Sequence, residues 1–198
     1  MKNLTIKLYH FTNRNNIELI LASRILKAGR HVMRGKIEHK AICFTSDPDP
    51  SGHDLTDGKQ ISAVNVLQMK YATEENGNYY CVDNTEFCIA MTVPSSQALV
   101  KATNLHKSKE MLGLTIAGHL PCSPTPSDTE LFETLNGIKR GTLKDKSPTW
   151  WYHFGDLQLT DFAVLHKQKD HSYARLKADI HGQVDLASIP VKQIFLYS

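Results

Sequence analysis

Two short runs near the amino terminus combine a histidine with hydroxyl side chains. The first is Leu8-Tyr9-His10-Phe11-Thr12, and the second is Ala41-Ile42-Cys43-Phe44-Thr45-Ser46. Both are rich in aromatic and β-branched residues, which favours strands. An imidazole can donate or accept a hydrogen bond, and hydroxyls at a strand end can face a ligand. We interpret the two strands as the floor of a nucleotide pocket, with His10 pointing into it.

Several common sites are excluded by the absence of their motifs. The sequence has no Gly-x-x-x-x-Gly-Lys phosphate loop and no Gly-x-Gly-x-x-Gly turn. It also has no His-Glu-x-x-His pattern, no paired cysteines and no Gly-x-Ser-x-Gly elbow. The ten histidines are scattered along the chain. A P-loop, a Rossmann site and a dedicated zinc site are therefore not expected.

The segments around the two runs predict strand, helix and strand. Thr5–Thr12 alternates as a strand does, and Asn15 with Glu18 forms a weak capping-box pattern for the following helix. Gly29 is placed to end that helix. The strand of residues 41–46 ends at Asp47-Pro48, because proline cannot continue a sheet ladder. The helix positions are Ile17, Ile20, Leu21 and Ile25.

The rest of the chain adds strands with inserted helices. The segments 79–82, 87–93 and 162–165 predict strands, and residues 184–197 predict one or two more. Helices are expected over residues 95–113 and over 129–135, the second capped by Asp128 and ended by Asn136-Gly137. Residues 59–70 suit either a helix or a strand, and residues 74–78 a turn. This order predicts one α+β domain, residues 1–198, with mostly antiparallel sheets.

Composition is that of an ordinary globular protein. The chain has 198 residues, of which 41% are hydrophobic, and a net charge of +3. No apolar run reaches the roughly 20 residues that span a bilayer, and the first residues are not expected to act as a secretion signal. The four cysteines, Cys43, Cys81, Cys88 and Cys122, are expected to be reduced in the cytoplasm, with a Cys81–Cys88 bridge as a weak alternative.

Residues 8–52 resemble the ADP-ribosyltransferase superfamily. The shared pattern is an aromatic-His-x-Thr strand, a helix closed by glycine, and a strand that ends in Thr45-Ser46. The resemblance is to the histidine-containing branch, which includes toxin and phage ADP-ribosyltransferases and RNA 2′-phosphotransferases. Ile189-Pro190 and Ile194 resemble the end of such domains. The implied fold is a pair of split antiparallel β-sheets with flanking helices.

This resemblance implies NAD as co-substrate, with cleavage of the bond between nicotinamide and ribose. The transition state is like an oxocarbenium ion, as in glycoside hydrolysis. His10 would hold the nicotinamide ribose, and an aromatic side chain would stack on the ring, with Tyr71 and Tyr79 as further candidates. The predicted cofactor-binding set is Tyr9, His10, Phe11, Thr12, Thr45, Ser46, Tyr80 and Trp151.

Members of the family usually carry a glutamate near the last strands, and this sequence has none after Glu133. Asp179 lies closest to the expected place. The predicted catalytic carboxylates are therefore Asp179 and Glu133. Each would accept a hydrogen bond from the ribose 2′-hydroxyl and stabilise the positive charge that develops on the ribose.

Two alternatives remain open. An RNA 2′-phosphotransferase would use basic residues such as Arg14, Arg30 and Arg34, and a catalytically inactive domain of the same fold would act by binding. The basic segments 30–40, read as an exposed loop, and 139–146, read as a turn, favour a nucleic-acid target slightly over a protein. A toxin or phage–host conflict role would add an antitoxin or host protein as partner. No membrane partner is expected.

Overall fold

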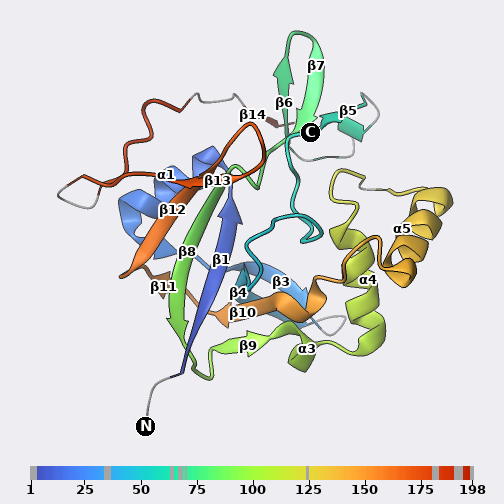
Figure 1. Cartoon of the computed structure of the whole chain (residues 1–198), viewed down its shortest axis with the longest axis horizontal. Helices are drawn as coiled ribbons and strands as arrows, with labels where there is room; N and C mark the ends of the chain where they lie inside the picture. Colours follow the sequence, from blue (N-terminus) through green and yellow to red (C-terminus); the bar gives the residue numbers. More distant parts are fainter. Residues whose placement is uncertain are drawn as a thin grey trace.

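A large antiparallel sheet forms the centre of the structure (Figure 1). The computed structural model describes residues 4–33, 37–62, 65–66, 69, 71–123, 125–179, 183–189 and 194–196. Within them the strand order is β13-β12-β8-β1-β4-β10-β9, and β3 pairs with β4. The strands are β1 Thr5–Thr12, β3 Gly29–Met33, β4 Ile37–Thr45, β8 Phe87–Pro94, β9 Leu99–Lys101, β10 Trp150–Phe154, β12 Phe162–Lys167 and β13 Tyr173–Arg175.

The sheet divides between β1 and β4. Strand β1 pairs with β8 along its whole length, from Thr5 opposite Pro94 to Thr12 opposite Phe87. Its pairing with β4 has a single register position, Tyr9 opposite Thr45. On the other side of the division, β4 pairs with β10 over five residues. The two halves are therefore joined at one point and diverge beyond it.

Helix α1, Arg14–Ser23, packs on the main core, which also contains Leu8 and Phe87. Ile17 and Ile20 are its buried apolar residues. The predicted extent of this helix was wrong at both ends. Asn13, not Asn15, is the N-cap, and Arg24 ends the helix in the left-handed conformation, with its N–H bonded to the Ile20 carbonyl. The next residues form β2, Ile25–Leu26, which pairs with β11, Leu157–Gln158.

The prediction of an exposed loop over residues 30–40 was also wrong. Strands β3 and β4 form an antiparallel pair there, with Arg30 opposite Lys40 and His31 opposite His39. The positive charges and the lack of apolar alternation concealed these strands. Backbone pairing at the edge of a sheet does not require apolar side chains. Residues 34–36, including Arg34, lie outside the described residues.

The predicted helix over residues 95–113 is divided. Leu99 belongs to β9, and two helices follow, α3 Ala102–Leu105 and α4 Ser108–Gly118. The last helix, α5, runs over Asp128–Arg140 and is longer than predicted. Ser127 is its N-cap, and it passes through Asn136-Gly137 before Gly141 ends it at φ 73°. The 3₁₀ turn η1, Ser147–Thr149, leads into β10.

A second sheet has the order β14-β6-β7-β5 in the described part of the chain. Its strands are β5 Gln60–Ile61, β6 Tyr71–Glu75, β7 Asn78–Cys81 and β14 Ile194–Leu196. Strand β5 lies at the start of residues 59–70, which were expected to form either a helix or a strand. The structure describes the rest of that segment only in part. The predicted turn at 74–78 is shorter, since only Asn76 and Gly77 lie outside the paired strands.

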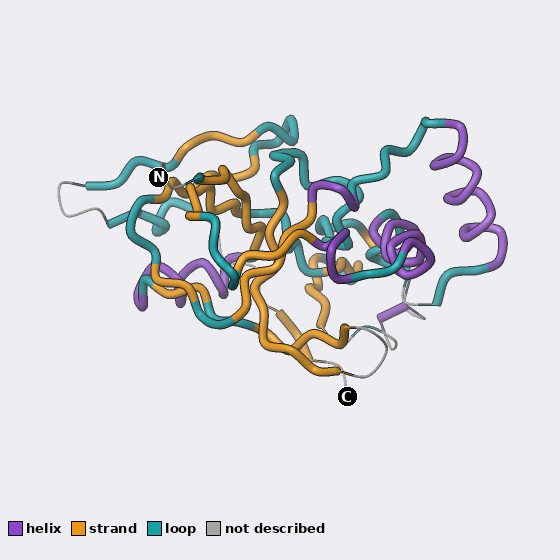
Figure 2. Tube along the Cα trace, turned by 90° about the horizontal axis from the view of Figure 1, so that it is seen from below, coloured by secondary structure: helices purple, strands orange, loops and turns teal. Residues whose placement is uncertain are grey.

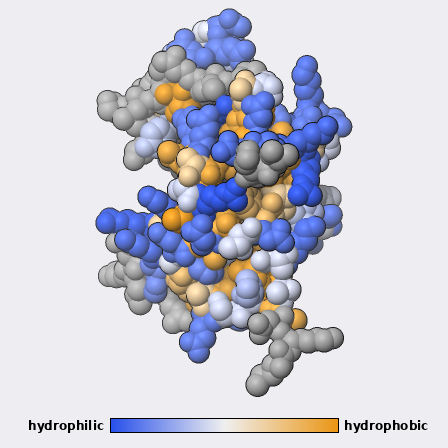
Figure 3. Space-filling model, turned by 90° about the vertical axis from the view of Figure 1, so that its left-hand side faces the viewer, coloured by the Kyte–Doolittle hydropathy of each residue, from blue (hydrophilic) through white to orange (hydrophobic). Residues whose placement is uncertain are grey.

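The arrangement is α+β with mostly antiparallel sheets, as predicted. Figures 1 and 2 show α4 and α5 to one side of the strands. On the face seen in Figure 3, apolar residues form small areas separated by hydrophilic ones. None of the helices in the described ranges combines the length and apolar character needed to cross a membrane.

Candidate functional site

Two cavities lie where the halves of the sheet separate. Their volumes are about 420 and 740 Å³, and both are lined by His10, His31 and Cys43. The smaller one, called here the aromatic cavity, extends toward β10 and the loop after β4. The larger one, called here the helix cavity, extends toward α1 and β3. His10 thus stands at the junction of two hollows whose sizes are typical of small-molecule sites.

The His10 side chain bridges the division of the sheet. Its Nδ1 lies 2.9 Å from the carbonyl oxygen of Cys43, so Nδ1–H donates to β4. The ring also meets the edge of Phe44, with 5.7 Å between centroids. Burial lowers the pKa of His10, although the bond to Cys43 opposes this effect. The ring is therefore neutral near pH 7, and Nε2, which has no hydrogen-bond partner among the described residues, is left as an acceptor.

The aromatic cavity is walled mainly by rings. They come from the facing strands β1, β4 and β10 because those strands meet at the Tyr9–Thr45 register position. A wall of this kind can stack on a flat heteroaromatic ligand, and it excludes water from one side of it. The rings are those of Tyr9, Phe11, Phe44, Trp150, Trp151 and Tyr152.

Three buried nitrogen atoms on residues lining this cavity have no hydrogen-bond partner in the described chain. They are His53 Nε2, His106 Nε2 and Trp151 Nε1. Trp150 Nε1–H donates to His53 Nδ1 at 2.6 Å, so the proton of the neutral His53 ring resides on Nε2. Buried polar groups are nearly always paired in folded proteins. Three exceptions around one cavity indicate a ligand with hydrogen-bonding atoms.

One carboxylate lines the aromatic cavity, that of Asp54. Desolvation raises the pKa of Asp54. The pKa of the Cys43 thiol is raised to about 12, mainly by desolvation and also by the charge of Asp54. The residue takes the left-handed conformation, with φ 59°. Such a backbone position is uncommon for a residue other than glycine and occurs often at functional sites.

The loop that carries His53 and Asp54 is held by α4. The Asp54 N–H donates to the carbonyl of Gly118 at 3.2 Å. A Cβ atom on Gly118 would lie 2.6 Å from the carbonyl oxygen of Gly52, so the helix can approach this closely only with glycine at that position. This contact fixes the loop against the helix, and with it the far wall of the aromatic cavity.

The predicted cofactor-binding residues fall into two groups. Tyr9, His10, Phe11, Thr45 and Trp151 line the aromatic cavity, and His10 with Thr12 lines the helix cavity. Ser46 and Tyr80 line neither of the cavities. Tyr80 lies in the second sheet, opposite Gln60.

The hydroxyl group of Thr45 is already engaged in the protein. It lies 2.9 Å from the hydroxyl of Thr149 and accepts from the Asp47 N–H at 3.0 Å. Ser46 is exposed, and its N–H donates to the Thr149 carbonyl at 2.9 Å. Both residues therefore brace the end of β4 against η1.

Neither predicted catalytic carboxylate lines these cavities. Glu133 is exposed on α5, beyond α4 from the sheet in Figure 1. Asp179 is exposed, and one of its carboxylate oxygens accepts from the Gln183 N–H at 2.8 Å. Their catalytic roles remain predictions, and the carboxylate that lines the aromatic cavity is that of Asp54.

Sequence reasoning missed His53, Asp54 and His106. A signal was present for the first two, since Gly52-His53-Asp54 follows directly on the proline-rich turn that ends β4. Polar residues after a strand end often reach a site. No local signal marks His106, which reaches the cavity from the end of α3.

Comparisons with protein-family models, with curated proteins and with solved structures found no match.

Proposed function

We propose that this protein is an NAD-dependent ADP-ribosyltransferase that acts on a macromolecular target. The observation that carries the proposal is the position of His10, whose imidazole stands between two cavities and keeps Nε2 available. A dinucleotide has two rings joined by a flexible diphosphate, which suits two hollows that meet at one side chain. The resemblance of residues 8–52 to the histidine-containing branch of this superfamily supports the same reading.

The aromatic cavity would take the nicotinamide end. Its rings can stack on the pyridinium, and the N–H groups of His53 and Trp151 can donate to the carboxamide oxygen. His10 Nε2 would accept from a hydroxyl of the adjoining ribose. The rest of the dinucleotide would extend into the helix cavity, where Lys27 is the only lysine or arginine among the lining residues.

The reaction requires charge stabilisation more than acid or base catalysis. The bond between the ribose C1′ and nicotinamide breaks, its electron pair stays on the departing ring nitrogen, and a cation develops on the sugar. Asp54 is exposed as a residue, yet desolvation raises its pKa, so its carboxylate is partly removed from water and would stabilise that cation more strongly than a fully solvated carboxylate would. A nucleophilic atom of the target then bonds to C1′ and loses its proton.

The test is nicotinamide release from labelled NAD in the presence of lysate or mixed nucleic acid. His10→Ala and Asp54→Asn should each lower the rate by about 10²- to 10³-fold, the usual cost of losing a group that stabilises the transition state. His153→Ala is the matched control. It lies on β10, outside both cavities, and bonds to the Gly155 carbonyl. Equal release by His10→Ala and the wild type would refute the proposal.

The second candidate is a binding module that has lost catalysis. It is favoured by the exposure of Asp54, because water in contact with a carboxylate weakens its attraction for a developing cation. It predicts that NAD binds in calorimetry and protects the fold against heat, while no nicotinamide is released.

RNA 2′-phosphotransfer has less support from the described residues. Arg14 is buried and already donates to the Leu186 carbonyl at 2.7 Å and to Glu18 at 2.9 Å. The aromatic cavity has no lysine or arginine in its lining. Activity confined to a 2′-phosphorylated RNA would nevertheless establish this function in place of ADP-ribosyl transfer.

A nucleic acid remains the favoured target. Lys27, which lines the helix cavity, is exposed, and so is Lys40, which precedes the lining residue Ala41, so both can contact phosphate groups. In the second basic segment Lys139, Arg140 and Lys144 are exposed, whereas Lys146 is buried and paired with Asp47 and Asp49. Labelled product that survives protease but not nuclease would support this target.

A further inference from the structure

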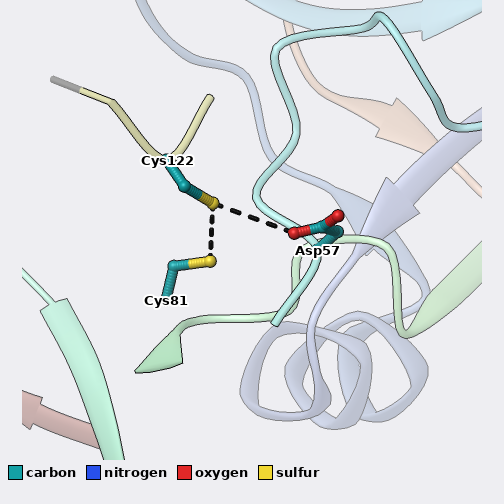
Figure 4. Close-up of side chains that lie close together, drawn as sticks. All are labelled: Asp57, Cys81 and Cys122. Atoms are coloured by element: carbon teal, nitrogen blue, oxygen red, sulfur yellow. Dashed lines mark hydrogen bonds between the residues drawn. The ribbon is translucent and has the colours of Figure 1, made fainter. Parts of the chain in front are cut away.

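Two cysteines far apart in the sequence lie in contact outside the cavities. Cys81 ends β7, and Cys122 follows α4, yet their Sγ atoms are 2.6 Å apart (Figure 4). The Cys122 Sγ also lies 3.8 Å from the Asp57 Oδ1. Cys88, the partner considered from the sequence, is buried in β8 and forms no bond to Cys81.

A metal ion is one explanation for such a cluster, since Asp57, Cys81 and Cys122 offer three ligand atoms close together. Two observations oppose it. Tetrahedral zinc with Zn–S bonds of about 2.3 Å separates two sulfur atoms by about 3.7 Å, well above the distance here. In addition, the Lys59 ammonium lies 2.7 Å from the Asp57 Oδ2, where its charge would repel a dication.

The short distance instead favours a reaction between the two sulfur atoms, in which one cysteine is a thiolate. A thiolate is the reactive form of cysteine. The hydrogen bond from Cys122 lowers the pKa of Cys81 to about 7, against the effect of burial, and the backbone N–H groups of Gly58 and Asp57 act in the same direction. The same contact and burial raise the pKa of Cys122. The pair therefore combines a thiolate with a thiol at near neutral pH.

We propose that Cys81 and Cys122 are a redox pair that forms a reversible disulfide when the protein meets a peroxide. The Cys81 thiolate attacks one peroxide oxygen, the O–O bond breaks, and a sulfenic acid and hydroxide are formed. The Cys122 sulfur then attacks the sulfenic sulfur, the S–S bond forms, and the sulfenic oxygen leaves as water with the Cys122 proton. In sum, two thiols and one hydrogen peroxide give a disulfide and two waters. Cys122 is partly exposed, which gives a small oxidant a path to the pair.

The crosslink would join β7 to the turn that follows α4. These segments belong to different parts of the fold, since β7 lies in the second sheet and α4 holds the loop of Asp54. A disulfide stabilises mainly by restricting the unfolded chain, and the enclosed loop here is long, with the two cysteines 41 positions apart. Oxidation should therefore raise the melting temperature as well as lock this junction.

The experiment treats the full chain with hydrogen peroxide, blocks free thiols, and measures intact mass and melting temperature. After blocking, the oxidised wild type should carry two fewer blocking groups than the untreated protein, gain roughly 5–10 °C in melting temperature, and revert with dithiothreitol. Cleavage after Glu86 separates Cys81 from Cys88, so a linked peptide identifies the partners. Cys43→Ser retains both cysteines of the pair. On treatment with peroxide it should lose two free thiols and gain as much in melting temperature as the wild type does.

Cys81→Ser and Cys122→Ser should each abolish the mass change and the thermal shift. A disulfide that involves Cys43 or Cys88 in the wild type would overturn the proposal, as would sulfinic acid without a crosslink. Stoichiometric zinc in the purified protein, lost in Cys81→Ser and protecting both thiols from peroxide, would replace the redox pair with a metal site.

Discussion

Two groups of polar side chains involve the loop between β4 and β5, and they differ in hydrogen bonding. The near group is at the start of the loop, where the Lys146 ammonium is 2.5 Å from Asp47 and 3.0 Å from Asp49, and the Lys146 side chain is 5% exposed. The far group consists of His53, in the middle of the loop, and His106, and each has a buried nitrogen atom without a partner in the described chain. The polar atoms of the near group are paired within the protein, whereas these two nitrogen atoms are not.

This difference separates a group that is paired within the protein from a group that could bind the ligand proposed above. A satisfied buried network holds the native conformation, and removing one member leaves the others unpaired. A buried nitrogen atom without a hydrogen bond destabilises the free protein. This cost is offset only when a ligand forms a hydrogen bond with that atom. Mutations in the two groups should therefore act on different quantities, folding stability in the near group and ligand affinity in the far group.

The largest effect is expected for Lys146→Met. It removes the charge that lowers the pKa of both Asp47 and Asp49, and it leaves their carboxylates beside an apolar side chain. Because Asp49 is 53% exposed and remains hydrated, the cost should be about 2–3 kcal/mol, below that of a fully buried pair.

Chemical denaturation measures this loss of stability. The control is Lys139→Met at the exposed end of α5, which should change stability by less than about 0.5 kcal/mol. If Lys146→Met were as stable as the control, the near end of the loop would not be the structural group described here.

An intermediate effect is expected from acid. Burial lowers the pKa of His10, and burial together with the Lys146 charge lowers that of His53 to about 4. The unfolded chain binds protons at its histidines near pH 6.5, before the folded chain does, so stability falls as pH drops below that value. The loss should be about 1 kcal/mol per histidine between pH 7 and pH 5.5, allowing for partial exposure.

The carboxylates titrate in a lower window. Asp47 and Asp49 have lowered pKa values, so their contribution is present above the normal aspartate pKa and is lost only as pH falls further. His53→Asn keeps a hydrogen-bond acceptor for Trp150. It should reduce the loss of folding stability between pH 7 and 5.5 and leave the loss at lower pH unchanged. An unchanged pH profile in this variant would show that His53 takes up its proton at the same pH in the folded and the unfolded chain.

The smallest effect is expected for His106→Phe. The ring contact with Tyr152, at 5.8 Å between centroids, can persist, while the unpaired Nε2 is removed. Stability of the free protein should change by less than about 1 kcal/mol, and NAD affinity should fall about fivefold, the worth of one hydrogen bond. Isothermal titration calorimetry measures the affinity, with His153→Phe as the control. A loss of stability with unaltered affinity would assign His106 to the near group.

Much of the central framework was predictable from local pattern. The strand Thr5–Thr12 is found where its residue types predicted it, and the strand predicted over residues 41–46 is the second half of β4, Ile37–Thr45. Local patterns failed where polar residues form paired strands, as at Arg30 and His31, because hydrogen bonding in a hairpin edge is independent of side-chain polarity. They also failed at Arg24, whose left-handed conformation ends α1 without a glycine.

The sequence by itself determined that His10 lies on a strand beside a second strand, and that the fold is α+β. Only the tertiary structure decided what surrounds that imidazole. His53 and Asp54 lie on a loop that is hydrogen-bonded to the carbonyl of Gly118, and His106 lies at the end of α3. Each depends on packing between segments tens of residues apart, which no spacing along the chain encodes, because such contacts form only when the whole core is assembled.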